Sequence, residues 1–323
     1  MCGVGERRGA LMPETGQWRT AAGGAPWGGR ALMPVLAGVC VLVTLALPVQ
    51  GGSLGRELAS LLGLLPALGT MVLGQTLMAR VGYLDPALFG VTLLAGVVVG
   101  LHGTSGDGDL VGGVLLALLL TVPFALFSAA LATNLRMSVA MVVALGVLAA
   151  ADRFSGLLLP DTVNTTNGLL NSVFDLPWGL LLMLGAYALL AVAFPAPEGV
   201  TAMEGASWWR MSRLVFLPAF GLAVLAGALN VSQIKMVSQY SPDTLAVPVV
   251  LALAAGGCLL PGGASLGGAL AGTLAATAVQ LYGYESNLGV DAEQVLLTAV
   301  AVAFFLVDLA RRGGIAPRTP HTS

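Results

Sequence analysis

The sequence predicts an all-α polytopic membrane protein with about ten transmembrane helices, and three observations lead to this fold class. Hydrophobic residues make up 57% of the 323 residues, charged residues only 9%, and the mean hydropathy is +0.89. A water-soluble domain carries roughly 25% charged residues, so a chain this poor in charge needs lipid around it. Glycine occurs 44 times, and small residues let membrane helices approach one another closely.

Ten apolar segments are candidate spans. A spanning helix needs about 20 mostly apolar residues, and two of the ten segments are shorter, which predicts tilted or broken helices or helices that extend into polar flanks. The ten segments are 31–49, 58–79, 87–101, 110–131, 138–151, 177–194, 214–233, 244–260, 265–281 and 293–310. The short ones are 87–101 and 138–151, and they make the count uncertain by one or two.

The basic residues predict the orientation, because cytoplasmic loops of membrane proteins collect arginine and lysine. With the N-terminus inside, eleven of the 14 basic residues fall in inner segments. Only Arg56, Arg153 and Lys235 fall in outer segments, and the opposite orientation inverts this ratio. We therefore expect an even number of spans and both termini in the cytoplasm.

Three regions follow from this reading. Residues 1–30 are polar and rich in glycine, and we expect a disordered cytoplasmic tail there. Residues 31–310 form the transmembrane domain, and 311–323 form a second cytoplasmic tail. A cleaved signal peptide is the alternative at the N-terminus, but the leader is long for one and no clear A-x-A site follows the first apolar run.

Several functions are disfavoured by motifs that the sequence lacks. There is no G-x-x-x-x-G-K-[ST] phosphate loop, no H-E-x-x-H and no G-x-S-x-G elbow, so we expect no enzymatic activity in this chain. The three cysteines and two histidines have no metal-ligand spacing, and we expect no metal and no cofactor. A formal net charge of −2 gives no reason to expect a nucleic-acid partner.

Three stretches carry motifs: the first two are rich in glycine, and the third ends in an aspartate shortly before two arginines. The first runs from Leu68 to Leu77 and continues into Gly82-Tyr83-Leu84-Asp85, the second contains Gly256-Gly257, Pro261-Gly262-Gly263, Ser265, Gly268 and Gly272-Thr273, and the third runs from Gln294-Val295 to Asp308 and Arg311-Arg312. In order and spacing they resemble the permease subunits of bacterial ABC importers, specifically the ribose-type sugar permeases. Two departures mark a divergent member: Pro86-Ala87 follow the aspartate where the family has Leu-Ser, and Gly90 comes one place late.

The resemblance implies a function and a set of partners. Such a chain forms the pathway for a small neutral solute, a sugar by this likeness, across the bacterial plasma membrane. It pairs with a second permease subunit, identical or related, is driven by separate ABC ATPase subunits and receives its solute from an extracellular binding protein. The alternatives are a branched-chain amino-acid-type permease, which shares the glycine motif, a secondary transporter or channel without an ATPase, and a structural membrane protein. The lack of evident acids inside the spans argues weakly against a secondary transporter.

Candidate pathway residues are the polar ones in or beside the spans, because neutral hydrogen-bonding groups suit a neutral polyol. They are Gln75, Thr76, Asp85, Asn230, Gln233, Thr273 and Gln280. Hydrogen bonding between helices explains each of them equally well, so both interpretations stay open.

The inner connection 195–213 is the candidate element that couples the permease to its ATPase. The resemblance places a short docking helix there, and its candidate residues are Glu204, Gly205, Arg210 and Arg213. Anchoring at the membrane surface by tryptophan and arginine explains the same residues without an ATPase.

The predicted orientation can be tested with single cysteines introduced into a chain whose own cysteines have been replaced. Because of the arginine and lysine distribution, we expect position 165 to react with an impermeant thiol reagent added outside intact cells. Position 205 should react only after the membrane is opened. Labelling of position 205 in intact cells contradicts the orientation.

Overall fold

The computed structural model describes residues 28–46, 54–103, 107–134, 137–158, 163–164, 174, 177–193, 207–234, 236–237, 243–260 and 264–311. The chain divides into two compact units, 1–32 and 33–323. In the first unit, the described residues form the opening turns of one helix. The packing described below lies within the second unit.

An α-helix lies over each of the ten predicted segments. The helices are α1 (Gly28–Ala46), α2 (Leu54–Arg80), α3 (Ala87–Gly103), α4 (Asp107–Asn134), α5 (Met137–Leu158), α7 (Trp178–Ala193), α10 (Leu217–Ile234), α11 (Asp243–Ala255), α12 (Leu266–Glu285) and α13 (Val290–Arg311). A short helix, α9 (Trp208–Met211), leads through a π-helical turn, η2 (Ser212–Phe216), into α10. Two short strands, β1 (Val163–Asn164) and β2 (Met236–Val237), pair antiparallel.

Some helices begin or end at other residues than predicted, because turn-forming or polar residues determine those ends. The predicted span 244–260 ends early, because α11 stops at Ala255 and two glycines follow it. The short segment 138–151 grows into α5, which continues past Arg153 into its polar flank. The segment 87–101 stays short, as a 17-residue helix.

Within the described residues, four helical segments are long and apolar enough to cross a membrane, and shorter apolar helices accompany them. The four are Leu58–Arg80, Asp109–Asn134, Trp208–Ile234 and Val290–Arg311, and the shorter ones are Leu32–Ala46, Ala87–Gly103, Trp178–Ala193 and Leu245–Ala255. The structure is therefore helical and compatible with a membrane protein, while the count of about ten spans stays a prediction.

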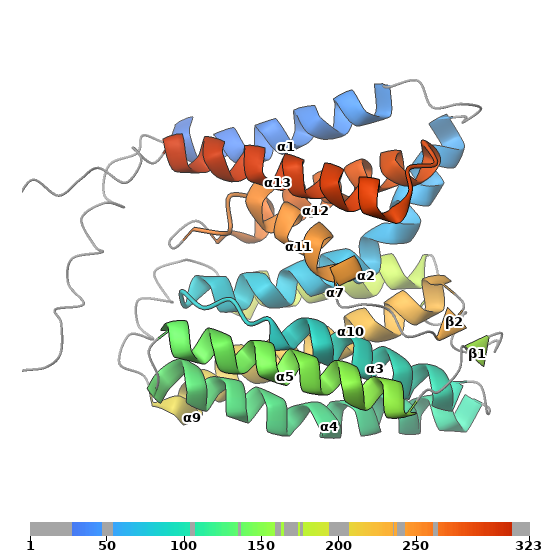
Figure 1. Ribbon diagram of the computed structural model, residues 1–323, viewed down its shortest axis with the longest axis vertical. Helices are drawn as coiled ribbons and strands as arrows, with labels where there is room; N and C mark the ends of the chain where they lie inside the picture. The colour runs from blue at the N-terminus through green and yellow to red at the C-terminus, as the bar shows by residue number, and fades with distance from the viewer. Residues whose placement is uncertain are drawn as a thin grey trace, which may run out of the picture. The chain divides into compact units, whose positions relative to one another are not determined.

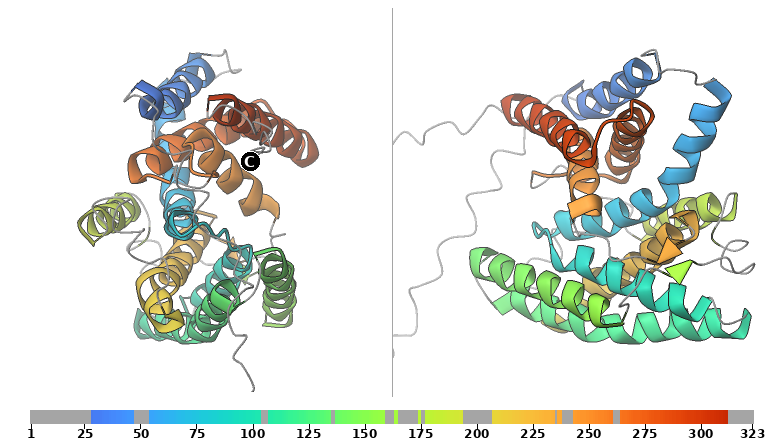
Figure 2. Two further views of the ribbon diagram at one scale, coloured as in Figure 1. Left: turned by 90° about the vertical axis from the view of Figure 1, so that its left-hand side faces the viewer. Right: turned by 45° about the vertical axis from the view of Figure 1, so that its right-hand side comes forward.

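Two series of four helices share one packing pattern. The first series is α2, α3, α4 and α5, and the second is α10, α11, α12 and α13. In the first series, α3 packs against both α4 and α5; in the second, α11 packs against both α12 and α13. The leading helices α2 and α10 pack against each other, and each also packs against the third helix of the other series, α2 on α12 and α10 on α4. Figures 1 and 2 show α3, α4 and α5 on one side of α2 and α10, and α11, α12 and α13 on the other.

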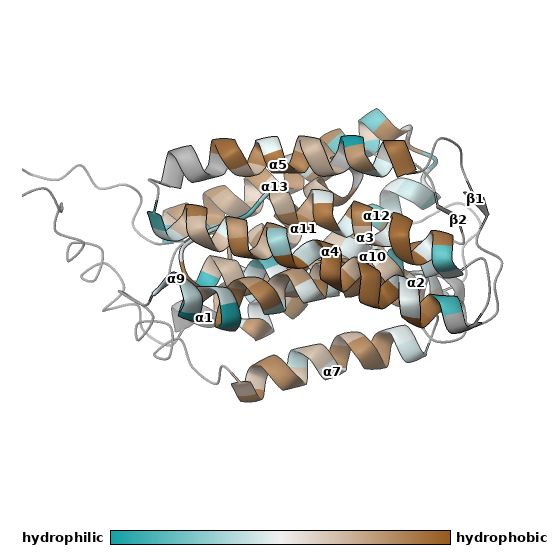
Figure 3. Cartoon of the chain, turned by 90° about the horizontal axis from the view of Figure 1, so that it is seen from below, coloured by the Kyte–Doolittle hydropathy of each residue, from teal (hydrophilic) through white to brown (hydrophobic). Residues whose placement is uncertain are grey.

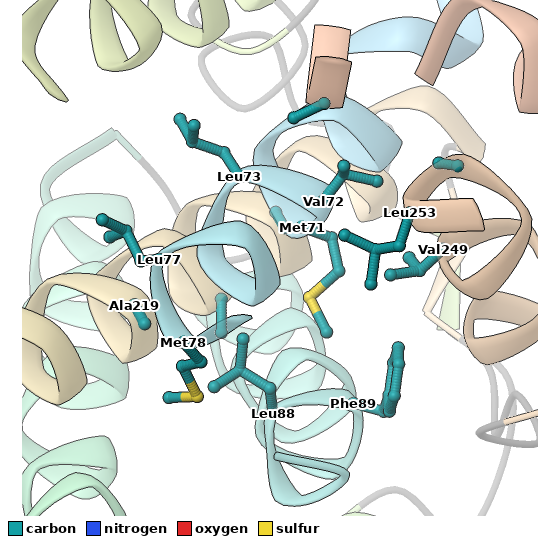
Figure 4. Close-up of a cluster of buried hydrophobic side chains, with 14 of the residues drawn as sticks. Met71, Val72, Leu73, Leu77, Met78, Leu88, Phe89, Ala219, Val249 and Leu253 are labelled. Atoms are coloured by element: carbon teal, nitrogen blue, oxygen red, sulfur yellow. The ribbon is translucent and has the colours of Figure 1, made fainter. Parts of the chain in front are cut away.

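The core follows α2, whose spanning stretch is 83% buried, against 17% for α13. Figure 4 shows Met71, Leu77 and Met78 of α2 among side chains from neighbouring helices, including Leu88 and Leu253. Because α2 contacts α7, α10, α11 and α12, its apolar residues are surrounded on several sides. It is the helix around which the others are arranged.

The outer helices carry large apolar side chains on their exposed surfaces. Leu119 on α4 is 68% exposed and Val192 on α7 is 79% exposed, and brown hydrophobic positions cover these helices in Figure 3. Soluble monomers rarely expose large continuous apolar patches. Such surfaces suit lipid contact.

Small residues bring the backbones of two helix pairs into contact. On α10, Gly227 lies against the carbonyl of Thr92, and a methyl group added there would lie 2.7 Å from the backbone nitrogen of Gly96. On α12, Gly272 lies against the carbonyl of Ala252, and an added methyl group would lie 2.7 Å from the nitrogen of Gly256. Each pair on α3 and α11 is four residues apart, which places both members on one helix face.

Substitution of Gly272 by alanine should therefore destabilise the protein. The new methyl group would overlap the backbone of α11, and overpacking costs about 1–3 kcal/mol. Gly267 lies on the same helix with open space around it, so Gly267→Ala is the matched control and should leave the melting temperature unchanged or slightly raised. Equal melting temperatures for the two variants in detergent would contradict the close contact.

Candidate functional site

The first glycine motif forms the turn that ends α2. The N–H of Gly82 donates to the carbonyl of Ala79 over 3.1 Å, and the N–H of Tyr83 donates to the carbonyl of Met78 over 3.1 Å. Gly82 has φ of +77°, the left-handed conformation that glycine adopts without a steric penalty. This is the Schellman pattern of a helix end.

The second glycine motif ends α11 in the same way. The N–H of Gly257 donates to the carbonyl of Ala254 over 3.0 Å, and the N–H of Cys258 donates to the carbonyl of Leu253 over 2.7 Å. Gly257 has φ of +66°. The two motifs, more than 170 residues apart in the sequence, thus build the same turn.

A capped helix follows each turn. The N–H of Ala87 donates to Asp85 Oδ1 over 2.9 Å at the start of α3, and the N–H of Gly268 donates to Ser265 Oγ over 3.0 Å at the start of α12. Aspartate and serine are among the preferred N-cap residues. Pro86 follows the aspartate in the first helical position, which tolerates proline because its N–H is not needed there. The departure from the family pattern at Pro86 is therefore compatible with the helix start.

Gln75 fastens α2 to the turn that follows it. Its Nε2 donates to the carbonyl of Asp85 over 2.8 Å, and the N–H of Asp85 donates to its Oε1 over 3.3 Å. Both side chains are buried. The two predicted pathway residues thus lie together, and Gln75 satisfies both backbone groups of the residue that caps α3.

The third motif meets the second. Near the end of α13, Arg311 donates to Asp308 Oδ1 from Nε over 3.0 Å and also from Nη2. Asp308 is buried, and a methyl group added to Gly257 would lie 3.9 Å from its Oδ1. Arg80, the last residue of α2, lies within electrostatic range of Cys258 in the same turn. The second and third stretches therefore meet at the turn after α11, and the end of α2 lies near that turn.

The other candidate pathway residues fall into two groups. Thr76 and Thr273 are buried and donate to carbonyls of their own helices, those of Val72 and Ala269, over 2.7 Å each. Three residues are only partly buried: Asn230, Gln233 and Gln280. Glu204 and Gly205 of the candidate coupling loop lie outside the described residues.

The described end of the coupling loop is an exposed aromatic and cationic surface. Trp208 and Trp209 are both exposed, with ring centroids 5.7 Å apart in an edge-to-face arrangement. The guanidinium of Arg213 lies 5.6 Å from the centroid of the Trp209 ring, and Arg210 is exposed beside them. We call Trp208, Trp209, Arg210 and Arg213 the α9 surface.

Sequence reasoning missed the polar contact that holds α7. The hydroxyl of Tyr187 donates to the carbonyl of Gly69 on α2 over 3.3 Å, and Thr273 on α12 is its other polar neighbour. Met183 packs where Gly69 lacks a side chain. A single tyrosine in an apolar helix was the available signal, but the sequence does not name its partner.

No protein-family model, curated protein or solved structure matches the chain. Among the described residues, no group of three or more His, Cys, Asp or Glu side chains could hold a metal ion. The case for a function therefore rests on the three stretches and on the turn where the second and third meet.

Neighbouring substitutions on α2 separate a packing role from a role in solute contact. Gln75→Leu should lower the free energy of unfolding by about 2–3 kcal/mol, because it leaves the buried N–H and carbonyl of Asp85 without Gln75, and an unsatisfied buried group costs about 1–3 kcal/mol. Thr76→Val is the control and should cost well under 1 kcal/mol, because the Thr76 hydroxyl bonds only within its own helix. Chemical unfolding in detergent gives both values, and a Gln75→Leu protein as stable as Thr76→Val would contradict the packing role.

Proposed function

We propose that the chain is the permease subunit of a bacterial ABC importer of the ribose-type sugar class. It forms, with a second permease subunit, the pathway for a small neutral solute across the plasma membrane. Separate ATPase subunits supply the energy, and an extracellular binding protein supplies the solute. The observation that carries the proposal is the meeting of the second and third family-like stretches at one turn, where Gly257 lies next to Asp308.

The helical arrangement supports a membrane-embedded function. Apolar side chains cover the outward surfaces of α4 and α7, and the basic residues alternate along the chain as the orientation requires. With the N-terminus inside, the two capped turns, the α9 surface and the end of α13 all belong to the cytoplasmic side. Figure 1 shows α9 and the C-terminal end of α13 at one end of the helices, and β1 and β2 at the other.

The best candidates for solute contact are the polar residues whose side chains make no hydrogen bond within the fold in the described part of the chain. Gln75 and Asp85 are bonded to each other, and Thr76 and Thr273 to their own helices. Asn230, Gln233 and Gln280 remain partly exposed. In the proposed orientation they lie toward the outer ends of α10 and α12, where a binding protein delivers solute, and their uncharged groups suit a polyol.

The α9 surface is the proposed docking site for the ATPase, together with Glu204 and Gly205 of the preceding loop. Arg213 lies over Trp209, and this contact orders one face of the short helix. Arg210 is exposed beside that face and offers five donors to an acidic partner. The π-helical turn η2 joins this surface directly to α10, and such turns are frequent at functional sites.

A secondary transporter is the second candidate, because the packing pattern is shared by two series of helices. If the chain alternates in direction as predicted, α2 and α10 run in opposite directions, and so do the series that they lead. Inverted repeats of this kind are frequent among secondary transporters. The two candidates differ in whether transport needs an ATPase chain.

The α9 surface gives the test of the proposed importer. Purified alone, the chain should hydrolyse no ATP, because it lacks a phosphate loop. When the chain is isolated from its own membranes in mild detergent, an ABC ATPase with vanadate-sensitive activity should co-purify with it. Arg210→Glu should lower the recovered ATPase at least about tenfold, since loss of one side of a buried charge pair costs about 2–5 kcal/mol. A bulky residue at Gly205 should act in the same direction.

Arg153→Glu is the matched charge reversal, on the predicted outer side, and should leave ATPase recovery unchanged. If Arg210 only contacts lipid, its replacement costs roughly 1 kcal/mol and the ATPase stays bound. Solute uptake by proteoliposomes that hold the chain alone would contradict the importer and support the secondary transporter.

A further inference from the structure

Three buried polar groups lie in or beside the turn after α2, and none of the three has a hydrogen-bonding partner among the described residues. They are Oδ2 of Asp85, the hydroxyl of Ser128 on α4 and the hydroxyl of Tyr83. Asp85 and Ser128 are 0% exposed and Tyr83 is 5% exposed. An unpaired buried polar group costs about 1–3 kcal/mol, more for a charge, so three in one place call for a chemical explanation.

One oxygen of the Asp85 carboxyl accepts a hydrogen bond, and the other has no partner among the described residues. Oδ1 accepts the N–H of Ala87 as the cap of α3. Ser128 lies close enough to interact with the carboxyl, yet Oδ2 and Ser128 Oγ form no bond of ordinary geometry. An ionised carboxyl can only accept hydrogen bonds, whereas a protonated one donates through its O–H. The Ser128 hydroxyl could donate to an ionised Oδ2, and a protonated Oδ2 could donate to Ser128 Oγ. Burial at 0% exposure favours the second arrangement, because a carboxylate loses far more hydration free energy on leaving water than the neutral acid does.

Burial is the largest influence on the pKa of the Asp85 carboxyl. Burial raises the pKa of Asp85 above its ordinary value, and the Ser128 hydroxyl and the Ala87 N–H lower it in part. Among the side chains that the structure describes, the charged or titratable groups on the elements packed around it are Tyr83 in its own turn, Arg80 on α2, His102 on α3, Asp109 on α4, Arg153 on α5 and Arg213 on η2. Arg213 lies over Trp209, and His102 and Asp109 lie at the far ends of their helices from this turn.

We propose that Asp85 and Ser128 form a proton-binding site in which Asp85 is held as the neutral acid and donates its proton to Ser128 Oγ. The bond ties the turn after α2 to α4. The site lies close to η2 and α9, because Tyr83 packs on Phe216 of η2 with ring centroids 5.8 Å apart and α4 contacts both η2 and α9. The inference does not depend on which solute or energy source the chain uses.

Infrared spectroscopy of the full chain in lipid tests the bound proton directly. At neutral pH the wild-type protein should show a protonated carboxyl C=O band above the amide I region that shifts in D₂O. Asp85→Asn should abolish this band, and Ser128→Ala should move it to higher frequency because the acid loses its acceptor. Asp109→Asn, an exposed acid on α4, is the control and should leave the band unchanged. Absence of the band from the wild type, or its persistence in Asp85→Asn, overturns the proposal.

The pH dependence of unfolding gives a second readout. Asp85 is protonated in both states below about pH 4; above it the unfolded chain releases a proton that the folded chain keeps. The unfolding equilibrium constant of the wild type should then rise, relative to Asp85→Asn, by up to about tenfold per pH unit until the folded carboxyl also ionises. A relative gain in stability with rising pH overturns the proposal.

Two further measurements cover the remaining outcomes. If Asp85→Asn does not fold, aspartate labelled with ¹³C at the side-chain carboxyl should shift the band in otherwise wild-type protein, and Ser128→Ala should shift it again. A band that the label does not move overturns the proposal. Stabilisation by Na⁺ at constant ionic strength, lost when Ser128 is replaced by alanine, also overturns it, because the site would then hold a metal cation and not a proton.

Discussion

The contacts of helix backbones at Gly227 and Gly272 determine where the chemistry of this protein can lie. In lipid, no hydrophobic effect drives helices together, so packing and close approach must hold them. Gly227 fixes α10 on α3, and Gly272 fixes α12 on α11. Each crossing sets the position of a helix that carries a turn at one end, the Asp85 turn before α3 or the Gly257 turn after α11. The distance between the helices is thus set by glycines, which have no side chain, and the buried polar groups must fit into the remaining space between the helices.

Helices satisfy their own backbone hydrogen bonds, so the breaks between them are where unsatisfied groups accumulate. The two glycine turns solve this problem in the same way, with a left-handed glycine that closes one helix and a side-chain cap that opens the next. At the first turn Gln75 adds two bonds to the backbone of Asp85. At the second, the Asp308–Arg311 pair lies against Gly257. Polar residues that look like candidates for solute contact therefore also serve the turns.

The sequence predicted the helices well because their signal is local, a run of apolar residues long enough to bury its backbone. It predicted their ends less well, since the end of α11 depends on the conformation of Gly257 and not on hydropathy. It did not predict which faces meet. The pairing of Tyr187 with Gly69, 118 residues apart, and the approach of Ser128 to Asp85 depend on how helices rotate about their axes. The glycine spacings did indicate close contacts between helices, but a glycine in the sequence does not show which helix it contacts.

The place of the first turn within the fold links it to the α9 surface. Phe216 ends the π-helical turn that joins α9 to α10, and its ring packs on Tyr83, two residues before Asp85. A displacement of α9 by a bound partner would press Phe216 against the turn whose other polar contacts are to α2 and α4. That turn is held in place, because Gln75 fastens it to α2 and Asp85 caps α3. A turn held in this way passes a displacement on to α3, and α3 is the helix that packs against α4, α5 and α10. In the proposed importer, the path from the ATPase to the helices therefore runs through a contact of two aromatic rings and a capped turn.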